Sequence, residues 1–240
     1  MKLDSYFQKP GLNEESFSFK QRRKRMLLLS KLVGDKRCLR ILDLGGTREF
    51  WIANGKFLPD GSISSVDLIN QNFDLDSDQT ETTFKIHSHI GDIRSFANLP
   101  NTNYDLVFSN SAIEHVGNLR DQLAVSEVVR KAGKYHFVQT PARRFPVEPH
   151  FHVPFFQFLP LWLKTFLHQR FGCGFMGREP RWLEARIACE NTRLLSRREL
   201  EHLFPGSRIV PERVLGLVKS WMVTNLPDPV EQDQRGTTPS

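Results

Sequence analysis

The sequence predicts a single α/β domain built on a doubly wound, mostly parallel sheet. Five short apolar runs alternate with helical or loop segments between residues 39 and 140. Most of these runs are nearly continuous in apolar residues, which is typical of strands that are buried on both faces. Strands that alternate with helices in this way predict right-handed crossovers, and a chain of 240 residues is long enough to bury one such core.

The strands can be placed from these runs and from two later ones. The first five are expected at 39–44, 62–68, 84–90, 104–109 and 135–140. Two final strands, at 208–210 and 214–223, are expected to close the sheet as an antiparallel hairpin. The expected architecture is therefore a Rossmann-like sheet of seven strands.

Three helices can also be placed. Apolar residues recur at helical spacing over residues 19–33, which predicts a helix packed on the sheet before the first strand. Asn118 can cap a helix after the fourth strand, and Gly133 can end it. Ser196 and Glu199 form a capping-box pattern ahead of another short apolar helix.

The regular alternation breaks after the fifth strand. Residues 141–192 are rich in proline and aromatic side chains, and we interpret them as a lid inserted into the domain. The domain is then expected to span residues 1–226. Residues 227–240 form a polar segment that is expected to be a disordered tail.

Composition excludes some classes of function. The net charge of +6 is mildly basic, and the basic run at 21–25 is expected to be the solvated face of a helix. Cys38, Cys173 and Cys189 form no Cys-x-x-Cys pair, so neither a disulfide framework nor a zinc site is indicated. The apolar stretch at 151–167 is too interrupted to span a bilayer, and the expected location is the cytoplasm.

The first strand ends in a glycine turn. In Asp43-Leu44-Gly45-Gly46-Thr47 the glycines allow the backbone to approach a ligand closely. The dinucleotide fingerprint Gly-x-Gly-x-x-Gly is absent, which argues against a pyrophosphate seat. In a doubly wound sheet, ligands bind beyond the carboxyl ends of the strands, where this turn lies.

Polar residues are expected at the ends of the next two strands. Asp67, with Leu68 beside it, is expected to end the second strand, where a carboxylate can accept hydrogen bonds from the ribose of a nucleoside ligand. Asp92 follows the third strand and can accept from an adenine amino group, while Ile93 packs on the ring. A helix cap is the alternative role for Asp92.

The fourth strand leads directly into Asn110, Glu114 and His115. With the preceding segments, this series resembles the class I S-adenosylmethionine-dependent methyltransferases, especially the "type 11" group with an Asn-x-x-x-Glu-His segment. The resemblance covers roughly residues 38–140, and 193–223 fits the closing helix and hairpin. It implies S-adenosylmethionine as cofactor, with Gly45 and Gly46 under its methionine portion.

The same resemblance assigns residues to the other parts of the cofactor. It implies that Asp67 holds the ribose, that Asp92 and Ile93 hold the adenine, and that the backbone of Asn110 lies beside the sulfonium. The third glycine of the family's usual loop is missing here, because Thr47 follows Gly46 directly.

Histidines are the candidate catalytic bases. His115, with Glu114 before it, is the first candidate, since an imidazole titrates near neutral pH. His150 and His152 are the second. These two could also bind a metal with Glu148, but no further ligand is evident, so no metal is expected.

The acceptor is expected to lie under the lid. Arg143 and Arg144 leave the fifth strand toward the cleft and could bind an anionic group of the acceptor. The resemblance suggests a small molecule, a glycan or a lipid-linked glycan that is methylated on oxygen, and the aromatic lid could also contact a membrane surface. Nucleic acid is not expected, because no RNA-binding module is evident. The alternatives are an RNA methyltransferase and a non-catalytic binding module with this fold.

Overall fold

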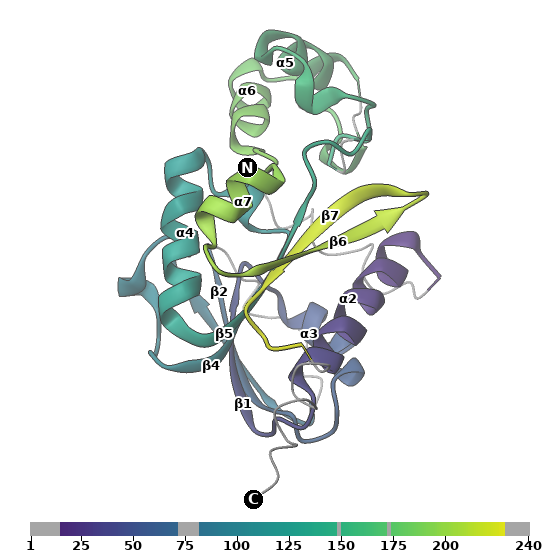
Figure 1. The fold of residues 1–240 in the computed structure, drawn as a ribbon. Coiled ribbons are helices and arrows are strands. Elements are labelled where there is room, and N and C mark those ends of the chain that lie inside the picture. The colour runs from purple at the N-terminus through teal and green to yellow at the C-terminus, as the bar shows by residue number, and fades with distance from the viewer. Residues whose placement is uncertain (1–14, 72–81, 148–149, 172–173, 229–240) are drawn as a thin grey trace, which may run out of the picture.

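The computed structural model describes residues 15–71, 82–147, 150–171 and 174–228. It confirms a seven-stranded sheet with the order β3-β2-β1-β4-β5-β7-β6 (Figure 1). The first five strands pair in parallel, and β7 pairs antiparallel with both β5 and β6. The chain moves outward from β1 and then returns to place β4 on the other side of it. The switch point of the sheet therefore lies between β1 and β4.

The strands lie close to where the sequence predicts them. Their bounds are β1 (Leu39–Leu44), β2 (Ile63–Asn70), β3 (Lys85–Ile90), β4 (Tyr104–Asn110), β5 (Gly133–Pro141), β6 (Arg208–Val214) and β7 (Leu217–Thr224). Two bounds differ. The second strand continues to Asn70 instead of ending near Leu68, and a tight turn at Leu215 and Gly216 separates the final pair. Both turn residues have a positive φ, as a two-residue hairpin of type I′ requires.

Helices cover both faces of the sheet. Their bounds are α2 (Phe17–Val33), α3 (Arg48–Asn54), α4 (Leu119–Ala132), α5 (Leu161–Arg170), α6 (Trp182–Asn191) and α7 (Arg197–Leu203). Single 3₁₀ turns are η1 (Gly55–Phe57), η2 (Phe96–Asn98), η3 (Ile113–His115), η4 (Phe156–Phe158) and η5 (Gly174–Met176). The predicted caps are confirmed, because Asn118 and Ser196 each complete a capping box at the start of α4 and α7.

The core forms two layers because side chains alternate along β1. Leu42 and Leu44 pack with α4 and α7 on one face of the sheet. Ile41 packs with α2 and with Trp51 of α3 on the other face (Figure 1). Both layers are fully buried around β1 and β4, so the switch point is backed by rigid structure on both sides.

The expectation that the basic run of α2 is solvated is wrong for two of its five residues. Arg23 and Lys24 are exposed, but Gln21 and Arg25 are buried. These two lie four residues apart, and Arg25 is in turn four residues before the buried Leu29. Helical spacing therefore places all three on the face that packs against the sheet.

The segment after β5 builds a separate layer of helices, α5 and α6, at one end of the domain (Figure 1). Phe151, Phe156 and Cys189 form its own small core. The segment returns to the sheet where Leu195 pairs with Ala142. None of the helices in the described residues is long and apolar enough to cross a membrane. Cys173, Glu148 and residues 229–240 of the expected tail lie outside the described residues.

Candidate active site

The glycine turn after β1 lies against the segment that follows β4. Gly45 has a φ of +83°, and its N–H donates to the carbonyl of Ile69 over 2.8 Å. A Cβ at Gly45 would lie 2.5 Å from the Cβ of Ala112, so only glycine fits here. Thr47 then caps α3, because its Oγ1 accepts from Phe50 N–H. The turn thus presents a bare backbone beside the N-terminus of a short helix.

Asp43 supports this turn from inside the protein. Its carboxylate is buried and accepts a 2.7 Å hydrogen bond from the indole of Trp51. A Cβ at Gly46 would overlap this carboxylate, so the glycine is needed for the acid beneath it. Burial raises the pKa of Asp43 to about 7, although the bond from Trp51 opposes the shift.

Asp67 does not end its strand, so that part of the sequence interpretation is wrong. It lies three residues before the end of β2, where its Oδ2 accepts from the Tyr104 hydroxyl at 2.7 Å. Its Oδ1 lies 3.0 Å from Nδ1 of His87 and 3.4 Å from Nε2 of His89. Leu68 is fully buried in the core. The role of Asp67 at a ribose stays a prediction, but its carboxylate already has protein partners.

Asn70 is the polar residue that ends β2, and no local sequence pattern indicates its position. Its carbonyl accepts from Gly91 N–H, and the neighbouring Ile69 carbonyl accepts from Gly45 N–H. Asn70 therefore lies level with the glycine turn at the carboxyl edge of the sheet. The parallel register, which pairs Leu44 with Ile69, could not be read from the sequence.

Asp92 and Ile93 follow β3 as predicted, but their surroundings differ from the expectation. Asp92 is bound by Arg94, whose Nη2 lies 2.6 Å from Oδ2, and this hydrogen-bonded pairing lowers the pKa of the carboxyl group. Arg94 also contacts Asp121 at the start of α4. Ile93 is buried in the core beneath the edge. Roles at the adenine stay predictions for both residues.

Arg25 of α2 joins the ends of β4 and β5, a role that was not predicted from the sequence. Its guanidinium donates to Asn110 Oδ1 at 3.0 Å and to Gln139 Oε1 at 2.9 Å. It also forms two bonds to Glu212 of β6, at 3.0 and 2.8 Å. Burial alone would raise the pKa of Glu212, but Arg25 and Ser220 hold it below its ordinary value. The side chain of Asn110 is thereby fixed at the switch point.

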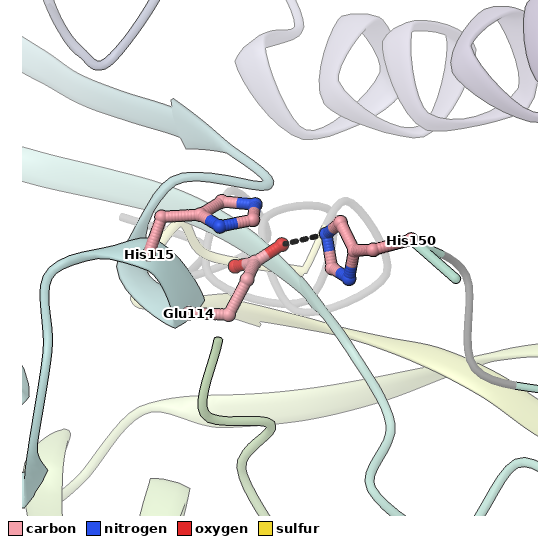
Figure 2. Close-up of side chains that lie close together, drawn as sticks. All are labelled: Glu114, His115 and His150. Atoms are coloured by element: carbon pink, nitrogen blue, oxygen red, sulfur yellow. Dashed lines mark ion pairs between the residues drawn. The ribbon is translucent and has the colours of Figure 1, made fainter. Parts of the chain in front are cut away.

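Glu114, His115 and His150 come together beyond the end of β4 (Figure 2). The first two lie in η3, whereas His150 comes from the segment after β5. Oε1 of Glu114 lies 4.0 Å from Nε2 of His150, and the two imidazole rings meet edge to face with centroids 4.5 Å apart. One side-chain ligand atom from each residue lies within 4.8 Å of the other two.

Burial governs the charges in this cluster. Glu114 is fully buried, and this raises the pKa of its carboxyl group despite the nearby His150 and the hydrogen bond from Thr140. Burial likewise lowers the pKa of His115 well below its ordinary value. The Thr140 hydroxyl donates to Oε2 of Glu114 at 3.0 Å. The Glu114 carbonyl accepts from Arg193 N–H, so the returning end of the segment after β5 also holds η3 in place.

Three predicted residues lie outside this cluster. His152 is exposed although it is only two residues from His150, so these two imidazoles do not share one face. Arg143 and Arg144 are exposed at the start of the segment after β5. Glu148, the further ligand that the sequence offered for a metal beside His150 and His152, lies outside the described residues. The carboxylate that lies near His150 in the structure is that of Glu114.

Comparisons with known proteins yield matches among solved structures. No family model matches the chain, and no curated protein matches it. The cyclopropane synthase MmaA2 from Mycobacterium tuberculosis aligns with a TM-score of 0.51 at 14% identity, over 85% of this chain and 66% of that one. The N-terminal domain of EvdMO1 with SAH bound aligns with a TM-score of 0.50 at 16% identity, over 85% and 79%.

A variant of LepI in complex with SAH and a substrate analogue also aligns, with a TM-score of 0.50 at 14% identity. That match covers 83% of this chain and 46% of LepI, so the chain spans about half of that protein's length. At these identities the comparisons establish the fold. The strand order, the antiparallel hairpin and these alignments show that the chain has the fold of the class I S-adenosylmethionine-dependent methyltransferases.

Proposed function

We propose that this protein is a methyltransferase that transfers a methyl group from S-adenosylmethionine to a hydroxyl group of a small acceptor. The observation that carries the proposal is the contact between Gly45 and Ala112. It places the bare turn after β1 against the segment that leads, two residues later, into Glu114. A cofactor seat and a cluster of polar side chains therefore adjoin one another at the switch point.

The chain offers a suitable seat for the cofactor. The turn at Gly45 and Gly46 leaves no room for a side chain, so its backbone can lie directly against a ligand. We assign the ribose to Asn70, because this residue and not Asp67 ends β2. Asp92 and Ile93 remain the candidates for the adenine, and Asn110 for the methionine portion. When bound there, S-adenosylmethionine supplies an activated methyl group, whose transfer to oxygen leaves S-adenosylhomocysteine and releases the acceptor's proton.

The chain's own contribution is to align the acceptor and to exclude water. His115 and His150 stand beyond the end of β4, where a neutral imidazole can accept a hydrogen bond from an acceptor hydroxyl and receive its proton. The lowered pKa keeps His115 neutral and makes it a weaker base than an ordinary imidazole. The helices α5 and α6 follow His150 in the chain, and we assign to them the cover over the acceptor. Exposed Arg143 and Arg144 are available to an anionic acceptor, such as a phosphorylated or carboxylated glycan.

Calorimetry with S-adenosylmethionine and S-adenosylhomocysteine tests the cofactor. We expect binding to the wild type that is weakened in Asn70→Ala. Absence of binding by the folded wild type would contradict the proposal. The acceptor is then sought with radiolabelled cofactor and extracted small-molecule, glycan, lipid and RNA pools. Label in the small-molecule or glycan pool supports the proposed acceptor class, whereas label confined to RNA would overturn it.

A further inference from the structure

We infer that Glu114, His115 and His150 form a binding site for one divalent transition-metal ion. Two imidazole nitrogens and one carboxylate oxygen converge at the end of β4, with the three ligand atoms within 4.8 Å of one another. This donor set suits zinc and its neighbours, whereas calcium and magnesium prefer sites made of oxygen. The inference extends the proposed function, but binding of the ion does not depend on it.

The separations fit a site that closes slightly around an ion. Nitrogen and oxygen ligands lie about 2.0–2.2 Å from zinc, which puts them roughly 3.3 Å from one another in a tetrahedral site. The 4.0 Å between Glu114 Oε1 and His150 Nε2 is longer than a hydrogen bond and somewhat longer than that ligand spacing. His150 lies outside the regular helices and strands, so its movement can shorten this distance, and the full set of ligand atoms, now within 4.8 Å of one another, would have to draw together around the ion.

The burial and hydrogen bonds of Glu114 support a bound cation. The carboxylate is fully buried, and among the described residues its Oε1 accepts no hydrogen bond. Thr140 holds the other oxygen, Oε2, from the side of β5. Metal-binding carboxylates are commonly oriented by such a second hydrogen bond. A buried carboxylate that carries its charge is costly without a positive partner, and a cation shared with two imidazoles would provide one.

The position of the cluster indicates what the ion would do. Three protein ligands leave at least one coordination position open, as in catalytic zinc sites. The cluster begins two residues after Ala112, which lies against the glycine turn, so an ion held there would be near the proposed cofactor seat. A bound cation lowers the pKa of a coordinated hydroxyl group and fixes its orientation. The three side chains would then act as ligands, and the ion would activate the acceptor.

The test measures the ion directly. Tag-free protein is treated with chelator, exchanged into metal-free buffer and titrated with Zn²⁺ by calorimetry and with Co²⁺ by visible absorption. We expect one ion per chain, with specific binding lost in His115→Ala, His150→Ala and Glu114→Gln. Thr140→Val keeps the side-chain shape and should weaken binding about 10- to 100-fold. His152→Ala is the matched control, because this exposed imidazole lies two residues from His150 and should leave the affinity unchanged.

Two results would overturn the inference. One is the absence of stoichiometric binding to the wild type. The other is binding that survives unchanged in the folded His150→Ala variant, which alters a loop residue and so remains informative if Glu114→Gln does not fold. Binding of S-adenosylhomocysteine to the same samples separates the two proposals. Cofactor binding without metal contradicts only the metal site, and metal binding without cofactor contradicts only the proposed function.

Discussion

The Tyr104 hydroxyl donates a 2.7 Å hydrogen bond to Oδ2 of Asp67, and this bond ties the start of β4 to the middle of β2. Burial and the neighbouring carboxylate raise the pKa of Tyr104, so the phenol keeps its proton and remains the donor. His87 approaches the other carboxylate oxygen. Asp67 therefore stabilises the sheet, whereas Asn70, which ends β2, is the residue that we propose for the ribose of the cofactor.

The two positions can be separated by substitution. Asp67→Asn should lower the free energy of unfolding by about 1–3 kcal/mol, because Tyr104 and the histidines lose a charged acceptor. It should leave the affinity for S-adenosylhomocysteine nearly unchanged. Asn70→Ala should weaken that affinity about fivefold, which corresponds to one lost hydrogen bond of about 1 kcal/mol. Denaturant titration measures the free energy of unfolding, and calorimetry measures the affinity for S-adenosylhomocysteine. Loss of affinity in Asp67→Asn but not in Asn70→Ala would instead assign the ribose to Asp67.

Gly46→Ala should damage the turn through Asp43. The added methyl group would overlap the buried carboxylate, and overpacking of this kind costs about 1–3 kcal/mol. In an Asp43→Ala background the same change should cost clearly less, because the obstructing group is gone. A double-mutant cycle measured by chemical denaturation gives the coupling directly. Additive costs for the two substitutions would show that Gly46 is needed for another reason.

Asp43 should make stability fall as the pH rises through weakly acidic values. Its folded pKa of about 7 lies above the ordinary 3.8, so the folded protein holds this proton more tightly than the unfolded chain does. The stabilisation is complete below about pH 4 and is lost as the pH rises toward 7. Relative to Asp43→Asn, the wild type should lose up to about 4 kcal/mol over this range.

The measurement for Asp43 is the difference in unfolding free energy between wild type and Asp43→Asn at several pH values. Taking the difference cancels the other titrating groups, because both proteins share them. The Asn side chain retains an oxygen acceptor for the Trp51 indole, so the loss of that hydrogen bond does not contribute to the difference. A difference that stays flat from pH 4 to pH 7 would contradict the raised pKa.

The fold was predictable because it follows from local patterns. Apolar runs of strand length and capping boxes at Asn118 and Ser196 are encoded within a few residues, and the structure confirms them. The end of β2 was misplaced because its register depends on pairing with β1, which no local pattern records. The sequence therefore placed Asp67 at the end of the strand, although it lies three residues before that end.

The candidate site was predictable only in part, for a similar reason. Glu114 and His115 follow a strand end, so sequence order alone indicates where they lie. The approach of His150 depends on the path of the chain through the segment after β5. The spacing of Arg25 to Leu29 is enough to predict that Arg25 is buried. Its bonds to Glu212, however, join residues that lie 187 positions apart in the sequence, which no local pattern indicates.

Arg25 should be far more important to stability than its neighbours in the basic run. Arg25→Met leaves Glu212 buried without its partner, and breaking a buried pair in this way costs about 3–5 kcal/mol. Lys24→Ala is the matched control, since an exposed side chain one residue away should change stability by less than about 0.5 kcal/mol. Adding Glu212→Gln to Arg25→Met should recover part of the loss, because the uncompensated charge is removed. Equal effects of the Arg25 and Lys24 substitutions in denaturant titrations would show that the pair contributes nothing.

Because Arg25 also holds Asn110, Arg25→Met with Glu212→Gln should still bind S-adenosylhomocysteine more weakly than the wild type, even where stability recovers.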